Sequence, residues 1–232
     1  MRRAQLFAWG GGALFVASLA YCMWWYLARL GVDRPFAGWP AIVADAALIT
    51  LFASHHSVFA REAVKRRLQP LVGGRLRSVY VCVASVLLFI VCIAWRPIGA
   101  TLFDVRGAAA VACAVVQLTG VALIAWSVAR IDPLELAGIR PAPAPRPGSG
   151  QADALQIGGP YRIVRHPLYL GWMLAAFASP HLTGDRFAFA LLTSLYLMIA
   201  VRWEERSLRL AFGDAYATYA AQVPWRVIPF IY

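Results

Sequence analysis

Charged residues are scarce in this chain. Lysine, arginine, aspartate and glutamate make up 14% of its 232 residues, whereas 61% are hydrophobic. Soluble domains carry about 25% charged residues, so the composition excludes an ordinary soluble domain. Acidic residues are rarer than basic ones: there are 11 acidic and 22 basic residues, which give a formal net charge of +11. Such a balance can indicate a nucleic-acid partner, but the distribution of the cations along the chain argues against one.

Residues that bind metals are also few. The four cysteines lie singly inside apolar runs and show no C-x-x-C spacing, which predicts packing residues and neither disulfides nor metal ligands. The four histidines are scattered, and none has a carboxylate at ligand spacing. We therefore expect no metal site.

Long apolar runs are what the chain has in excess. A membrane-spanning helix needs about 20 apolar residues, and four runs fit that length within tolerance. Two shorter runs are separated only by PHLTGDR, which predicts a helical hairpin that is thin or re-entrant. The sequence therefore predicts an all-α, polytopic integral membrane helical bundle of five or six transmembrane helices, with the lipid bilayer as a partner. The six runs are 6–27, 41–59, 79–95, 107–129, 168–179 and 187–201.

The cations follow this topology. If the six runs alternate across the membrane, 17 of the 22 lysines and arginines fall on one side. Positive charge concentrates on the cytoplasmic side of membrane proteins. Both termini are therefore predicted to be cytoplasmic, and the charge does not indicate a nucleic-acid surface.

A proline- and glycine-rich segment, RPAPAPRPGSGQADALQIGG, interrupts the pattern at residues 140–159. Its composition is typical of an extended, flexible connection. We therefore predict a four-helix membrane region at 1–131, a flexible cytoplasmic linker at 132–160, and a cofactor-binding hairpin with a C-terminal helix at 161–232.

The stretch GPYRIVRHPLYLGW, residues 159–172, gathers cations at the start of an apolar run. Pro167 suits the first position of a helix, because the N–H that proline lacks is not needed there. His166 is then the cap, and the N–H groups that follow, together with Arg165, predict an anion site. The alternative interpretation is that the arginines extend toward lipid phosphates.

A second stretch, RWEERSLRLAFGDAYATYAAQVP, contains the paired carboxylates Glu204 and Glu205. Glu205 and Arg209 have the spacing of a helix ion pair. Glu204 is then expected to face inward, where it needs a cation such as an ammonium or a sulfonium. Apolar residues at helical spacing predict an amphipathic cytoplasmic tail helix: Leu208, Phe212, Ala215 and Tyr219.

Together the two stretches resemble the C-terminal half of the membrane methyltransferases typified by isoprenylcysteine carboxyl methyltransferase. The elements G-x-Y, R-H-P-x-Y-x-G and E-E-x-x-L-x-x-x-F-G-x-x-Y-x-x-Y occur in that order. LFASHHSVFAREAVKRRL and ASPHLTGDRFAFALLTSLYLMIA also resemble the nurim family, which includes bacterial methyltransferases acting on methanethiol. The resemblance implies S-adenosylmethionine as the cofactor. We expect the protein in the bacterial inner membrane, with the active site on the cytoplasmic side that the cation count indicates.

The resemblance also implies a cofactor pocket, in which Glu204 binds the methionyl amino group. We assign the cofactor carboxylate to the helix start beside Arg165. The predicted cofactor-binding residues are Leu155, Gln156, Tyr161, Arg165, His166, Pro167, Tyr169 and Glu204.

A thiol acceptor requires further help, because the thiolate is the nucleophile and the pKa of free cysteine is about 8.5. An enzyme that methylates thiols should therefore supply a base or a cation. We predict catalytic roles for His56, which shares a helix face with Asp45, and for Arg202.

The predicted activity is S-methylation of a small thiol such as methanethiol to dimethyl sulfide. Near residue 132 the chain reads IDPLELAGIRP, where the family pattern has a histidine and phenylalanines. The acceptor therefore stays open between a small thiol and a lipophilic carboxylate or amine. A non-catalytic membrane protein and an NADPH-dependent reductase are the remaining alternatives.

Overall fold

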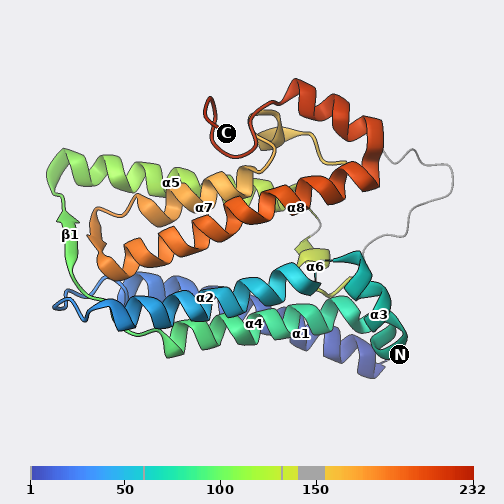
Figure 1. The fold of residues 1–232 in the computed structure, drawn as a ribbon, viewed down its shortest axis with the longest axis horizontal. Helices are drawn as coiled ribbons and strands as arrows, with labels where there is room; N and C mark the ends of the chain where they lie inside the picture. Colours follow the sequence, from blue (N-terminus) through green and yellow to red (C-terminus); the bar gives the residue numbers. More distant parts are fainter. Residues whose placement is uncertain (1, 60, 132, 141–154) are drawn as a thin grey trace. The chain divides into compact units, whose positions relative to one another are not determined.

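The fold is known from a computed structural model that describes residues 2–59, 61–131, 133–140 and 155–232 (Figure 1). Its helices confirm the predicted all-α class, and the described residues form one two-stranded sheet, β1 with β2. Most of the flexible connection predicted at 140–159, namely residues 141–154, lies outside the described residues. In chain order the elements are α1 (Arg2–Ala28), α2 (Trp39–Phe59), α3 (Glu62–Val72), η1 (Gly73–Arg75), α4 (Leu76–Ala94), β1 (Thr101–Asp104), α5 (Gly107–Ala129), α6 (Pro133–Leu136), η3 (Gly159–Arg162), α7 (Pro167–Phe177), β2 (His181–Thr183) and α8 (Gly184–Gln222).

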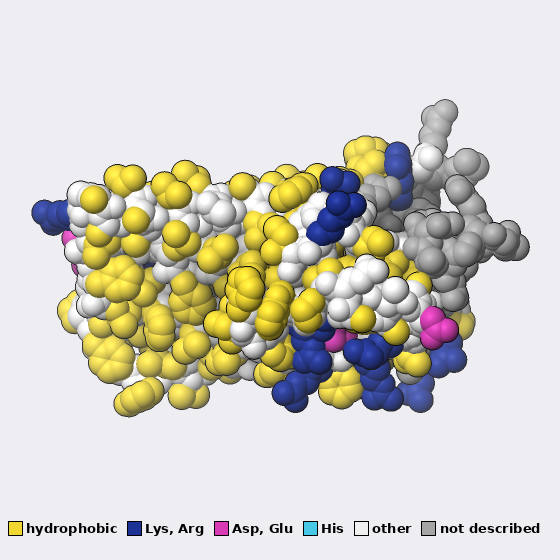
Figure 2. All heavy atoms as spheres, turned by 90° about the horizontal axis from the view of Figure 1, so that it is seen from above, with side chains coloured by type: hydrophobic (Ala, Val, Ile, Leu, Met, Phe, Trp, Pro, Cys, Tyr) yellow, Lys and Arg dark blue, Asp and Glu magenta, His cyan; other side chains and the backbone are white. Residues whose placement is uncertain are grey.

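Five helical segments within the described residues are long and apolar enough to cross a membrane. Many of their large side chains are exposed, for example Val43, Leu118 and Ile199, each more than 60% exposed. Figure 2 shows hydrophobic side chains over much of the visible face. Exposure on this scale is unfavourable in water but suits lipid. The chain is a polytopic integral membrane protein, as predicted. The five segments are Gln5–Ala28, Trp39–Phe59, Val64–Ala94, Gly107–Ala129 and Gly184–Gln222.

The chain divides into two compact units, and the first comprises Met1–Phe103, Pro133–Ala142 and His181–Ala188. In this unit α4 packs against both α1 and α2. All four cysteines of the chain are free, as expected for packing residues. The second unit comprises Asp104–Asp132, Pro143–Pro180 and Phe189–Tyr232. The three-part division predicted from the sequence stays a prediction.

The TGDR sequence, expected only as a turn, supplies buried charges to the first unit. Asp185 is 2% exposed, and its carboxylate accepts hydrogen bonds from Trp95 Nε1 at 2.8 Å and from the Ile98 and Gly99 N–H groups at 2.9 Å each. Arg186 donates to the Leu27 carbonyl, at the end of α1, at 3.0 Å. Because a buried charge is stable only when its partners are in place, these residues fix the loop after α4 and the end of α1.

An Asp185→Ala variant is therefore expected to lose about 3 kcal/mol of stability or more, since it leaves three buried N–H donors without their charged acceptor. The measurement is the thermal unfolding midpoint in detergent. Asp104→Ala is the matched control, because its carboxylate is exposed and pairs with Arg106 at 3.5 Å, an interaction worth at most about 1 kcal/mol. Equal midpoints for the two variants would contradict the assigned role of Asp185.

In the second unit, α7 packs closely on α5. A Cβ placed on Gly120 would lie 2.6 Å from the Gly171 carbonyl oxygen, and one placed on Gly171 would lie 2.8 Å from the Gly120 carbonyl oxygen. Small residues at such a crossing let two membrane helices approach each other. Trp172 Nε1 also donates to Thr193 Oγ1 of α8 at 2.9 Å. The 11-residue α7 is about 16 Å long, too short to cross a bilayer, and packing on both neighbours holds it in place.

Helix α8 is longer than the predicted apolar run 187–201, because the charged residues after Val201 are good helix formers and continue it. It is interrupted at Gly213, whose φ of 50° favours glycine. Beyond this point Tyr216 and Tyr219 pack with Val223. The predicted tail helix, with Leu208, Phe212, Ala215 and Tyr219, is part of α8, and Gly213 interrupts it. Partly buried side chains pack against this cluster, namely Leu155, Tyr161, Leu208, Phe212 and Ala220.

Candidate functional site

The site lies where the start of α7 meets the C-terminal segment, both in the second unit. Helix α7 begins at Pro167, with His166 as its cap residue, as predicted. The backbone N–H groups of Arg165 and His166 donate to the carbonyls of Trp225 and Arg226 at 2.9 and 2.8 Å. These two hydrogen bonds hold the C-terminal segment against the R-H-P motif.

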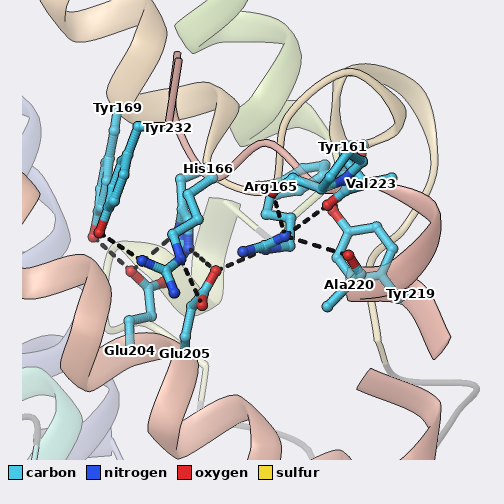
Figure 3. A network of polar contacts seen from close by, with 12 residues as sticks. Tyr161, Arg165, His166, Tyr169, Glu204, Glu205, Tyr219, Ala220, Val223 and Tyr232 are labelled. Carbon is cyan, nitrogen blue, oxygen red and sulfur yellow. Dashed lines mark hydrogen bonds and ion pairs between the residues drawn. The ribbon is translucent and has the colours of Figure 1, made fainter. Parts of the chain in front are cut away.

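A buried ion-pair network forms the base of the site (Figure 3). Arg165 Nε lies 2.7 Å from Glu205 Oε1, and the two residues are 8% and 4% exposed. Arg165 Nη1 also donates to the Val223 and Pro224 carbonyls at 2.7 and 2.9 Å. Arg226 Nε reaches Glu205 Oε2 at 3.1 Å. Burial of these charges is tolerated because each has several partners, so the network connects α7, α8 and the C-terminal segment.

These contacts correct two expectations from the sequence. Glu205, and not Glu204, is the buried carboxylate, and Arg165 takes the place that Arg209 was expected to have as its partner. The N–H groups of Tyr169 and Leu170 donate to the His166 carbonyl. The Nε and Nη1 atoms of Arg165 are bonded within the network, so the predicted anion site beside Arg165 stays a prediction.

Glu204 occupies the open side of the site and is 45% exposed. Its Oε2 accepts a hydrogen bond from the Tyr169 hydroxyl at 2.7 Å and lies 3.5 Å from His166 Nδ1. The His166 and Tyr169 rings stack, with centroids 5.4 Å apart. Figure 3 shows the Tyr232 ring beside that of Tyr169, with both hydroxyls toward Glu204. A carboxylate flanked by aromatic rings suits a cationic ligand.

The other predicted cofactor residues lie in the same unit. Leu155 and Tyr161 pack against the Tyr216 cluster. Burial, and then the negative charge of Glu204, raise the pKa of the Tyr161 hydroxyl above its usual value. Gln156 Nε2 donates to the Arg130 carbonyl at 2.9 Å, which fixes the chain just before η3. These residues therefore have defined positions within the unit that holds Glu204.

The two predicted catalytic residues belong to different units. Arg202 is exposed on α8, where it lines a pocket with Glu205 and Arg226. His56 belongs to α2 of the first unit and stacks on Phe52, with centroids 5.3 Å apart. Its Nδ1 is buried and has no hydrogen-bond partner among the described residues.

The part that the C-terminal segment plays in the site was not predicted from the sequence. Arg226 Nη1 donates to the Tyr232 hydroxyl at 2.8 Å, and the Tyr219 hydroxyl donates to the Tyr161 carbonyl at 2.8 Å. One signal was available, because Arg226 is the only charged residue in the stretch 225–232. Across the described residues, no group of three or more histidine, cysteine, aspartate or glutamate side chains is arranged to hold a metal ion.

Comparison with known proteins extends these observations. The family described as NnrU protein matches residues 46–226. A methanethiol S-methyltransferase from Pseudomonas deceptionensis is 36% identical over 194 residues, which cover 82% of this chain and 74% of that protein. Methanethiol S-methyltransferase 2 from Bradyrhizobium diazoefficiens is 37% identical over 198 residues, 81% of this chain and 73% of that protein. Nurim from Bos taurus is 29% identical over 178 residues, 72% and 68% respectively. No solved structure matches significantly.

Membrane-length helices with a polar, carboxylate-bearing site define an integral membrane protein of the helical-bundle class. Within that class, the chain belongs to the NnrU and nurim family, as the resemblance predicted.

Proposed function

We propose that this protein is a membrane methyltransferase that uses S-adenosylmethionine to methylate a small thiol such as methanethiol, giving dimethyl sulfide. The observation that carries the proposal is the half-exposed Glu204 carboxylate beside the stacked His166 and Tyr169 rings. The names of the methanethiol S-methyltransferase relatives, about 35% identical over most of the chain, support the reaction class.

The charge of Glu204 and the aromatic rings beside it suit this cofactor. S-adenosylmethionine, when bound, supplies a methyl group on a sulfonium. Glu204 accepts its ammonium group, and the Tyr161 and Tyr169 rings line the pocket. Pro167, also predicted to line it, is buried at the start of α7. His166 orients Glu204 and stacks on Tyr169. Leu155 and Gln156 close the pocket at the start of η3. Arg165 is a positioning residue that does not contact the cofactor, because its side chain is hydrogen-bonded to the buried Glu205.

Methylation of a thiol requires its thiolate form and a pocket that holds little water. Arg202 is the cation proposed to stabilise the thiolate. His56, which belongs to the first unit, is proposed to take the thiol proton, as predicted from the sequence. The site is proposed to face the cytoplasm across a bacterial inner membrane, consistent with the predicted bias of 17 of 22 cations to that side.

An acceptor panel tests the substrate. Membranes containing the protein and S-adenosylmethionine are given methanethiol or a prenylated cysteine carboxylate, and the products are measured by gas and liquid chromatography. We expect dimethyl sulfide above the level of a Tyr161→Ala control. Methylation of the prenylated acid alone would replace the thiol by a lipophilic acceptor. No product from either acceptor would support a non-catalytic role.

A further inference from the structure

An arginine-lined pocket on α8 is not explained by methyl transfer. The pocket has a volume of about 420 Å³. Arg202 is the only one of its arginines with a proposed part in the reaction, and Arg206 and Arg209 have none. The pocket is lined by Arg202, Glu205, Arg206, Arg209 and Arg226.

Among the described residues that line this pocket, four arginines face a single carboxylate. Its one carboxylate, Glu205, is already paired with Arg165 at 2.7 Å and with Arg226 at 3.1 Å. Arg202, Arg206 and Arg209 are exposed and spaced by four and three residues, so they share one helix face. Like charges at this spacing destabilise a helix. An anion in the pocket would relieve that repulsion.

One of these guanidinium groups is held in place. Arg209 Cζ lies 5.9 Å from the centroid of the Tyr216 ring, in a cation–π contact. Tyr216 is 1% exposed and belongs to the cluster that closes the C-terminal part of α8. The Arg209 side chain therefore has a rigid platform and loses less conformational freedom when it binds an anion.

The position of the pocket just after the apolar run indicates which anion it binds. Arg202 directly follows the apolar run that ends at Val201. Trp203 and Leu210 are 56% and 81% exposed. Tryptophan with arginine at the end of a spanning segment is typical of the membrane–water interface, where lipid phosphates lie. A phosphate oxygen accepts paired hydrogen bonds from guanidinium groups.

From these observations we propose that the pocket lined by Arg206, Arg209 and Arg226 binds the phosphate of an anionic phospholipid headgroup. The site goes beyond the proposed methyl transfer, because Arg206 and Arg209 have no part in that reaction. It ties the part of α8 that follows its apolar run to the anionic lipid surface.

The test uses the full chain in detergent, with binding of phosphatidylglycerol and phosphatidylcholine measured by native mass spectrometry. We expect saturable, preferential binding of phosphatidylglycerol. Arg206→Gln/Arg209→Gln should weaken it about 25-fold, because each arginine near an anionic surface contributes roughly a factor of five. Arg206→Lys/Arg209→Lys should keep most of it. Arg162→Gln is the control, since Arg162 is exposed in the same unit and does not line the pocket.

Several outcomes would overturn the proposal. Equal phosphatidylglycerol binding by the wild type and the double glutamine variant would show that the pocket is not the lipid site. An equal loss in Arg162→Gln would show that only the general surface charge attracts the lipid. Competition by inorganic phosphate at micromolar concentration would show that the ligand is a soluble phosphate. A matching loss of S-adenosylmethionine affinity in the double variant would make the pocket part of the cofactor site.

Discussion

An Arg165→Ala variant is expected to lose about 3–5 kcal/mol of stability, the usual cost of removing one partner from a buried ion pair. Glu205 would keep Arg226 but would lose its 2.7 Å partner, while both carboxylate oxygens stay buried. The Val223 and Pro224 carbonyls would lose their donor as well. Denaturant unfolding in detergent, followed by tryptophan fluorescence, measures the change.

Two further variants make this test specific. Arg162→Ala removes an exposed arginine from the same motif and should change stability by no more than about 0.5 kcal/mol. Arg165→Met combined with Glu205→Leu should recover much of the loss, because an apolar pair can replace a buried ion pair. If Arg165→Ala were as stable as Arg162→Ala, the network would not hold the C-terminal segment.

The second large effect is expected at Glu204. Glu204→Gln keeps the shape of the side chain and an acceptor for the Tyr169 hydroxyl, but it removes the charge proposed to bind the cofactor's ammonium. A hydrogen bond to a charged group contributes roughly 1.5–3 kcal/mol, so affinity for S-adenosylmethionine should fall about 10- to 100-fold. Calorimetric titration of the purified protein measures it.

Asp214→Asn provides the matched control for this titration, because Asp214 is an exposed carboxylate elsewhere on α8. Tyr169→Phe should have a smaller effect, about fivefold, since it removes one neutral donor and leaves the Glu204 charge. Unchanged cofactor affinity in Glu204→Gln would assign the ammonium to another group and reject the proposed pocket.

Much of the architecture follows from the sequence, because the thickness of the bilayer sets the length of an apolar run. The four long runs correspond to α1, α2, α4 and α5, and Pro167 marks the start of α7 because proline suits that position. The end of α8 was less predictable. An apolar run marks the membrane-spanning part of a helix. The helix itself continues for as long as its residues favour helical structure, so the end of the run does not predict the end of α8.

The orientation of the Glu204–Glu205 pair could not be derived from local spacing. Adjacent residues on a helix point about 100° apart, so the two carboxylates face different surroundings, but spacing does not say which one is buried. The choice depends on Arg165 and Arg226, which are 40 and 21 residues away in sequence and reach Glu205 only in the folded unit. Asp185 shows the same limit, because its partners Trp95, Ile98 and Gly99 are 86 to 90 residues away.

Transfer of an isotopic label from the cofactor to the thiol is the decisive measurement for the proposed methyl transfer. The purified protein in lipid nanodiscs is incubated with methanethiol and S-adenosylmethionine that carries a deuterated methyl group, and the headspace is analysed by mass spectrometry. We expect dimethyl sulfide with one deuterated methyl group, at a rate strongly reduced in Glu204→Gln. Absence of labelled dimethyl sulfide from folded protein, or an equal rate in Glu204→Gln, would contradict the proposal.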